Sequence, residues 1–107
     1  MSVSIQQDWV AGRRLYLLRY MEEVGGSALE SLIMNAMMRA FDREGRGTIL
    51  RDIDHLVAER CLEEEHITTG DGATSLRKLT LTVPRGEDAA YGRGDPVPGV
   101  QHSRWKR

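Results

Sequence analysis

In the N-terminal half of the chain, hydrophobic side chains recur at intervals of three and four positions, which places them on one face of a helix. The pattern predicts three helices, over residues 6–24, 27–41 and 48–61. Gly25 and Gly26 separate the first two helices, because glycine readily adopts the left-handed conformation found at helix ends. This half of the chain is therefore expected to be helical.

Polar residues at the predicted starts of the second and third helices are of the types that cap helices. Ser27 and Glu30 have the spacing of a capping box, in which the two side chains bind free backbone amides reciprocally. Thr48 precedes the apolar pattern of the third helix and is expected to cap it. The buried side of that helix is expected to comprise Ile49, Ile53, Leu56, Val57 and Cys61. Its outward side is expected to comprise Arg51, Asp52, Asp54, His55, Ala58 and Glu59.

After the third helix the hydrophobic period changes from the helical one to the alternation of a half-buried strand. Two strands are predicted, over residues 62–68 and 76–83, and Pro84 ends the second. The glycine- and aspartate-containing segment 69–73 between them has the composition of a hairpin connection. The sequence therefore predicts an α+β fold of the winged helix-turn-helix type, with three helices followed by a two-stranded β-wing.

Beyond Pro84 the composition turns to glycine, proline and charge. Residues 85–91 could form one helical turn, and no apolar pattern that could pack against a core follows them. We therefore expect a winged-helix domain over residues 1–84, followed by a flexible, extended or disordered basic tail over residues 85–107.

Composition limits the class of protein. The 107 residues, of which 40% are hydrophobic, suffice for one small domain, and the net charge of −1 gives no general attraction for polyanions. The single cysteine, Cys61, cannot form an internal disulfide and suits a reducing compartment. No apolar run approaches the roughly 20 residues that span a bilayer. We expect a soluble protein of the host-cell cytoplasm that has no contact with membranes.

Short motifs along nearly the whole chain resemble a family of small winged-helix proteins encoded in Mu-like prophages. The motifs are Arg13-Arg14-Leu15 with Leu17-Leu18, Thr48-Ile49-Leu50-Arg51-Asp52-Ile53-Asp54-His55-Leu56 with Glu59-Arg60-Cys61-Leu62, Leu79-Thr80-Leu81-Thr82, Gly86-Glu87-Asp88-Ala89, Gly92-Arg93 and Pro98-Gly99-Val100. The resemblance implies a winged-helix fold in a phage setting. It implies no catalytic residue.

The third helix of a winged-helix protein usually lies in the major groove, where side chains read base edges. Its predicted outward side and the turn before it offer two kinds of group: arginines for guanine or phosphate, and free amides for phosphate. Residues near the wing and in the tail would contact the flanking backbone. The candidate DNA-binding residues are Arg43, Arg46, Thr48, Arg51, Asp52, His55, Arg77, Lys78, Arg104, Lys106 and Arg107. The expected function is regulation of transcription through double-stranded DNA.

Charge leaves a second function open. The segment 48–61 carries two arginines and three acidic residues, and glutamates occupy positions 63–65. DNA affinity depends largely on neutralising phosphates, so an acidic edge beside the third helix opposes binding. The alternative is a non-enzymatic module that binds another phage protein in assembly or DNA packaging.

The sequence gives no indication of an enzyme. His55, His66 and His102 are far apart, and a single cysteine provides no zinc-binding set. Cys61 ends an apolar pattern and is expected to pack rather than to act as a nucleophile. No catalytic residue, cofactor or metal is therefore predicted.

The first helix carries more large apolar side chains than a small domain can cover. Trp9, Tyr16 and Tyr20 are the aromatic members of this set. Winged-helix proteins often pair through a terminal helix, and a twofold dimer presents two DNA-reading helices to neighbouring half-sites. We therefore expect a homodimer formed through the first helix.

Overall fold

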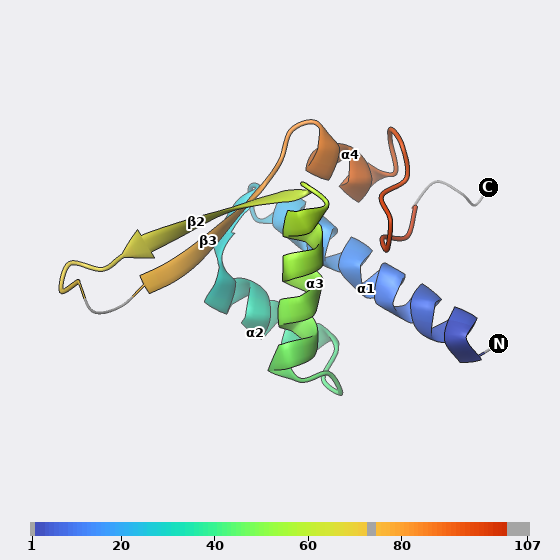
Figure 1. Cartoon of the computed structure of the whole chain (residues 1–107), viewed down its shortest axis with the longest axis horizontal. Helices are drawn as coiled ribbons and strands as arrows, with labels where there is room; N and C mark the ends of the chain where they lie inside the picture. The colour runs from blue at the N-terminus through green and yellow to red at the C-terminus, as the bar shows by residue number, and fades with distance from the viewer. Residues whose placement is uncertain (1, 73–74, 103–107) are drawn as a thin grey trace.

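The computed structural model describes residues 2–72 and 75–102, with side chains from residue 7 onward. In that part of the chain, four helices accompany a three-stranded antiparallel sheet (Figure 1). The elements are α1 (Ser2–Glu23), β1 (Ser27–Leu29), α2 (Glu30–Ala40), α3 (Arg46–Ala58), β2 (Leu62–Thr68), β3 (Ser75–Leu81) and α4 (Arg85–Tyr91). The chain is a small α+β domain, as expected, but with one more helix and one more strand than predicted.

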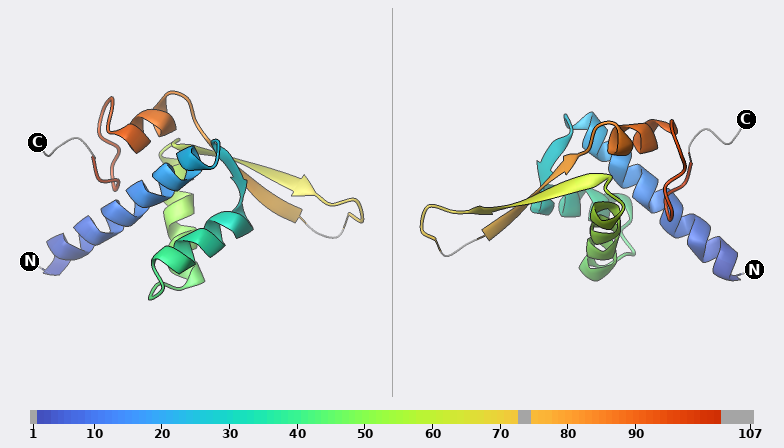
Figure 2. Two further views of the ribbon diagram at one scale, coloured as in Figure 1. Left: turned by 180° about the vertical axis from the view of Figure 1, so that it is seen from behind. Right: turned by 45° about the horizontal axis from the view of Figure 1, so that its top comes forward.

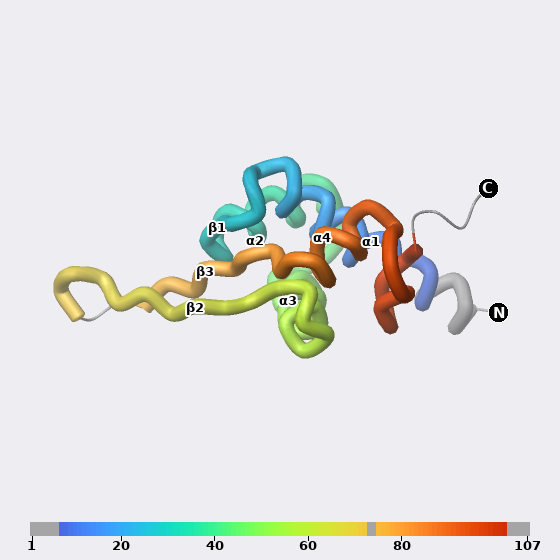
Figure 3. Tube along the Cα trace, turned by 90° about the horizontal axis from the view of Figure 1, so that it is seen from above, coloured from blue at the N-terminus to red at the C-terminus, as the bar shows by residue number. Residues whose placement is uncertain are grey.

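The sheet has β3 at its centre, with β1 on one side and β2 on the other. The β2–β3 hairpin confirms the prediction, and Figure 3 shows it extending away from the helices. Alternation buries Leu79 and Leu81, whereas Val83 lies beyond β3 and is exposed. β1 was not predicted; it is three residues long and pairs with β3 at residues 78–80. The sheet therefore joins the start of α2 to the hairpin.

The caps predicted for α2 and α3 are both wrong. Ser27 lies in β1, where its Oγ is 2.9 Å from Oγ1 of Thr80 on the neighbouring strand. Because this contact and the strand pairing hold Ser27, no capping box with Glu30 forms and α2 begins without a side-chain cap. α3 begins at Arg46, two residues before Thr48, and Gly45 occupies its N-cap position without a side-chain cap.

The predicted end of α1 is confirmed. Gly25 and Gly26 have φ angles of 97° and 93°, a conformation that side chains other than glycine rarely adopt. The Gly26 amide donates to the carbonyl of Met21 at 2.7 Å, which satisfies one of the last free carbonyls of the helix. The glycine pair thus turns the chain from α1 into β1.

The core lies between the sheet and the first three helices. Its fully buried side chains include Leu17, Leu18, Met21, Ile33, Met37, Ile49, Ile53, Leu56 and Leu79. The predicted apolar side of the third helix is buried, except for Val57, which is half-buried. Each such large side chain contributes about 1.5–3 kcal/mol by leaving water.

The expectation that residues 85–107 form an extended or disordered tail is wrong for the described residues 85–102. Residues 85–91 form α4, in which Ala89 and Ala90 are buried against α1, and Val97 and Val100 are also buried. The segment after α4 turns back alongside α1, as Figures 1 and 2 show, and the amide of Gln101 donates to the Ala11 carbonyl at 3.1 Å. Four small apolar side chains are enough for this packing, although they form no periodic pattern.

Candidate nucleic-acid interface

α3 lies between the β2–β3 hairpin and the N-terminal half of α1 (Figure 1). It buries Ile49, Asp52, Ile53 and Leu56 and leaves one side open to solvent. On this open side, Arg51 and Asp54 are exposed, and Arg46 is exposed in the first turn. An arginine-bearing helix face next to a projecting hairpin is a surface that could contact DNA.

Arginines with no ion-pair partner among the described residues gather around the start of α3. Arg43, Arg46 and Arg51, which are candidate DNA-binding residues, are all exposed. Arg39, in the last turn of α2, is likewise exposed and was missed. Its position just before the turn into α3 is the only sequence signal that could have identified it. These four cations are free to meet phosphate or base edges.

Ion pairs offset part of the negative charge of the acidic residues of α3 and its exit. Asp52 binds Arg13 and Arg14, and Asp54 binds Arg77, with the oxygen 2.9 Å from the arginine nitrogen. Glu59, directly after α3, binds Arg85 at 3.3 Å. Asp52 and Glu59 thus have cations of their own from other segments, whereas Asp54 shares Arg77 with Glu30 and Glu64.

The glutamates at positions 63–65 do not form one acidic edge. Successive side chains of a strand point to opposite faces of its sheet. Glu64 lies opposite Leu79 and contacts Arg77, so its side chain is on the face that packs against the helices. Glu63 and Glu65 are on the other face, and both are exposed. Their carboxylates thus lie on the side of the hairpin directed away from α3.

Asp52 is not on the outward side of the helix, and the expectation that it faces solvent is wrong. Its side chain is 0% exposed and accepts hydrogen bonds from Nε and Nη2 of Arg13 at 2.5 and 3.1 Å. Nε of Arg14 donates to it at 3.0 Å. The two guanidinium groups lie 38 and 39 positions away in the sequence, so nothing in the local pattern indicates them. A carboxylate in this position cannot contact a base.

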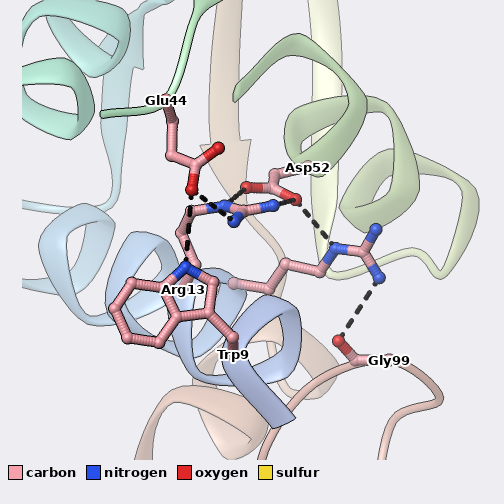
Figure 4. A network of polar contacts seen from close by, with 6 residues as sticks. Trp9, Arg13, Glu44, Asp52 and Gly99 are labelled. Atoms are coloured by element: carbon pink, nitrogen blue, oxygen red, sulfur yellow. Dashed lines mark hydrogen bonds and ion pairs between the residues drawn. The ribbon is translucent and has the colours of Figure 1, made fainter. Parts of the chain in front are cut away.

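The Asp52 network also includes the turn before α3. Arg13 is also 3.6 Å from Glu44 in the turn before α3, and the indole of Trp9 donates to the same carboxylate at 3.4 Å (Figure 4). Hydrogen bonding to Asp52 raises the pKa of the Arg13 guanidinium, so it stays charged. The network fixes α3 against α1.

His55 faces the C-terminal segment rather than open solvent. Its Nε2 lies 2.7 Å from the carbonyl oxygen of Pro98, and Nη1 of Arg14 donates to the neighbouring carbonyl of Gly99 at 3.4 Å. Both His55 and Thr48 are half-buried. Of the candidate DNA-binding residues on α3, Arg46 and Arg51 are therefore the ones whose side chains are exposed to solvent.

The hairpin residues Arg77 and Lys78 point to opposite faces of the sheet. Arg77 is held by carboxylates of Glu30, Asp54 and Glu64, which argues against its contacting phosphate. It borders a hollow of about 200 Å³ that Arg46 also lines. Lys78 is half-buried and has no ion pair within the described ranges. The predicted tail residues Arg104, Lys106 and Arg107 lie outside the described residues.

Two of the three aromatic residues predicted at the dimer interface of the first helix lie in one exposed cluster. Trp9 and Tyr16 are 60% and 47% exposed, and both rings pack edge-on against Phe41, with centroids 6.4 and 5.2 Å away. Tyr20 instead is half-buried and packs against the core. Phe41, the last residue of the predicted second helix, was missed as part of this cluster. The exposed aromatic cluster is therefore Trp9, Tyr16 and Phe41.

The described ranges show neither a metal-binding cluster nor an accessible cysteine. No three or more His, Cys, Asp or Glu side chains there are placed to hold a metal ion. Cys61 is buried, and burial raises the pKa of its thiol, so it is a poor nucleophile.

None of the described helices is long and apolar enough to cross a membrane. No protein-family model matches the chain, and no curated protein or solved structure is significantly similar to it.

Proposed function

We propose that this chain is a winged-helix DNA-binding protein that places α3 in the major groove of double-stranded DNA. The order of the elements supports this proposal: α1, β1, α2 and α3 are followed by the β2–β3 hairpin, which would be the wing. Together α2, the turn and α3 would form the helix-turn-helix. A phage setting, which the resemblance to Mu-like prophage proteins implies, and a regulatory role in the host-cell cytoplasm are part of this proposal.

The observation that carries the proposal is the distribution of charge around α3. The carboxylates of Asp52, Asp54 and Glu59 are paired, whereas Arg43, Arg46 and Arg51 are exposed without ion partners in the described part of the chain. Unpaired arginines are the groups that neutralise phosphates and that form bidentate hydrogen bonds to O6 and N7 of guanine.

In the proposed complex the residues have distinct roles. Arg46 and Arg51, on the first two turns of α3, would meet base edges or the phosphates beside them. Arg43 and Arg39 would contact the backbone that runs past the turn, where they add affinity without reading sequence. The basic residues Arg104, Lys106 and Arg107 would contact flanking phosphates, whereas Lys78 is on the hairpin face that carries Glu63 and Glu65.

A binding measurement at two salt concentrations tests this function. Purified protein is mixed with pooled fragments of a prophage genome at low salt and at physiological salt, and retention is followed by fluorescence anisotropy on the recovered fragments. We expect a discrete fragment to be retained at the higher salt, since specific contacts outlast the purely ionic ones. Absence of binding at low salt would contradict the proposal.

A second function, binding to another phage protein without reading DNA, is favoured by a different observation. Glu63 and Glu65 lie exposed and without ion partners in the described chain, on the face of the hairpin directed away from α3. An acidic hairpin face is unsuited to DNA and could meet a basic protein in assembly or packaging. Absence of DNA binding together with capture of a defined phage protein would favour it.

The exposed aromatic cluster supports a homodimer. Trp9, Tyr16 and Phe41 form a contiguous apolar surface at the junction of α1 and the end of α2. Large aromatic side chains are enriched at protein interfaces. A twofold axis through this cluster would bring two copies of α3 to neighbouring half-sites.

A further inference from the structure

Arg77 is the point at which the projecting hairpin is attached to both helices below it. Its Nε donates to Glu30 of α2 at 2.8 Å, and its Nη1 lies 2.9 Å from Asp54 of α3 and 3.0 Å from Glu64 of β2. Its side chain is only 14% exposed. One guanidinium therefore joins three elements that are distant in the sequence.

The position of Arg77 in the sheet makes this attachment important. β1 pairs with β3 only as far as Lys78, so Arg77 is the first β3 residue that β1 does not support. Farther out, the side chains of Ser75 and Leu76 are exposed, as are those of β2 from Glu63 onward. Within the described ranges, no ion pair other than those of Arg77 joins the hairpin strands to α2 or α3.

Arg77 also offsets negative charge where the hairpin meets the helices. Glu30 and Asp54 have no other cationic partner in the part of the chain that the structure describes. Without Arg77, three carboxylates would face one another, and Asp54 would place an unpaired negative charge on the open side of α3. Like charges at this separation repel, and repulsion would move the hairpin away from the helices.

We propose that Arg77 is a positioning residue that sets the angle of the β2–β3 hairpin against α3. A guanidinium presents its donors in one plane, so its contacts to Glu30, Asp54 and Glu64 fix direction as well as distance. Arg77 also shields DNA from the Asp54 carboxylate and does not itself contact phosphate. This second role rests on the proposed DNA-binding function; the first does not.

The first test measures the hairpin without DNA. Residual dipolar couplings of backbone amides give the orientation of β2 and β3 relative to the helices in the wild type, Arg77→Gln, Arg77→Lys and Arg93→Gln. Arg93 is an exposed arginine paired with Asp88 near α4, so its variant is a matched control. We expect the hairpin couplings to shrink in Arg77→Gln, to change less in Arg77→Lys and to stay unchanged in Arg93→Gln, with the helix couplings preserved throughout. Unchanged hairpin couplings in Arg77→Gln would overturn the positioning role.

The second test uses DNA and separates shielding from direct contact. We expect Arg77→Gln to weaken binding by about tenfold, and Asp54→Asn added to it to recover most of that loss, because the unshielded carboxylate is then absent. A direct phosphate contact predicts the opposite: no recovery with Asp54→Asn, and a salt dependence reduced by about one counterion. If the wild-type protein binds no DNA, the proposed function fails while the dipolar couplings still decide the positioning role.

Discussion

A buried carboxylate at the centre of a helix–helix contact is stable only if the charge is matched. Asp52 has both of its oxygens bound by guanidinium groups, and Arg13 is itself 4% exposed. Removing either partner of such a pair leaves an uncompensated charge away from water, which costs several kcal/mol. At the scale of single residues, this network is the most sensitive point of the domain.

We predict that Asp52→Asn lowers the free energy of unfolding by about 3 kcal/mol, because Arg13 loses its counter-charge while the volume is unchanged. Urea denaturation followed by far-UV circular dichroism measures this. Asp54→Asn is the matched control on the same helix; its carboxylate is 64% exposed, so we expect a loss of less than about 1 kcal/mol. Equal losses in the two variants would contradict the account of the network.

At the scale of elements, the C-terminal segment is held to α1 and α3 at Gly99. This glycine has a φ angle of 77°, and a Cβ atom there would lie 2.6 Å from both Nη1 of Arg14 and Nε2 of His55. Gly94 has a similar φ angle of 71°, but its Cβ would meet Asp88 no closer than 3.4 Å. Comparing alanine substitutions at these two glycines therefore distinguishes the effect of backbone strain from the effect of a steric clash.

We predict that Gly99→Ala destabilises the protein by about 2 kcal/mol and Gly94→Ala by about 1 kcal/mol, since both suffer the strained φ angle but only the first suffers a clash. Thermal unfolding of the two variants gives the comparison. Hydrogen exchange at the Gln101 amide, which is bound to Ala11, should increase in Gly99→Ala alone. Indistinguishable variants would mean that the segment is not held tightly at Gly99.

The elements differ in how much of their formation is visible in the sequence. α2, α3 and β3 were predictable, because each carries a local period in its own residues. That period is weak in α1 and absent from β2, whose side chains are exposed from Glu63 onward. β1 could not be predicted: its three residues are strand because they pair with β3, some fifty positions later. α4 and the packing of Val97 and Val100 likewise depend on α1, not on any pattern of their own.

The candidate site shows the same division. Arg43, Arg46 and Arg51 could be selected from the sequence because exposed positions follow from helical period and turn composition. The burial of Asp52 and the ion pairs of Arg77 could not be predicted, because the charged partners of both residues come from distant segments of the chain. Ion pairing across the fold therefore changed the electrostatic interpretation of α3.

At the scale of the whole molecule, the exposed aromatic cluster predicts self-association. We expect sedimentation velocity to show a dimer at high micromolar concentration, and Trp9→Ala with Tyr16→Ala to give a monomer, since large aromatic anchors carry much of the energy of an interface. Tyr91→Ala removes an exposed aromatic of α4 and should leave the dimer intact. A wild-type monomer at that concentration would rule out this interface.

DNA binding by the whole molecule should depend on the arginines at the start of α3. The most direct measurement compares the affinity of wild-type protein, Arg46→Gln/Arg51→Gln and the Arg93→Gln control for a retained prophage fragment, over a range of salt concentrations. The account predicts that the double variant loses about 3 kcal/mol, roughly a hundredfold in affinity, with a shallower salt dependence, while the control binds as the wild type does. Equal affinity of the double variant and the wild type would contradict it.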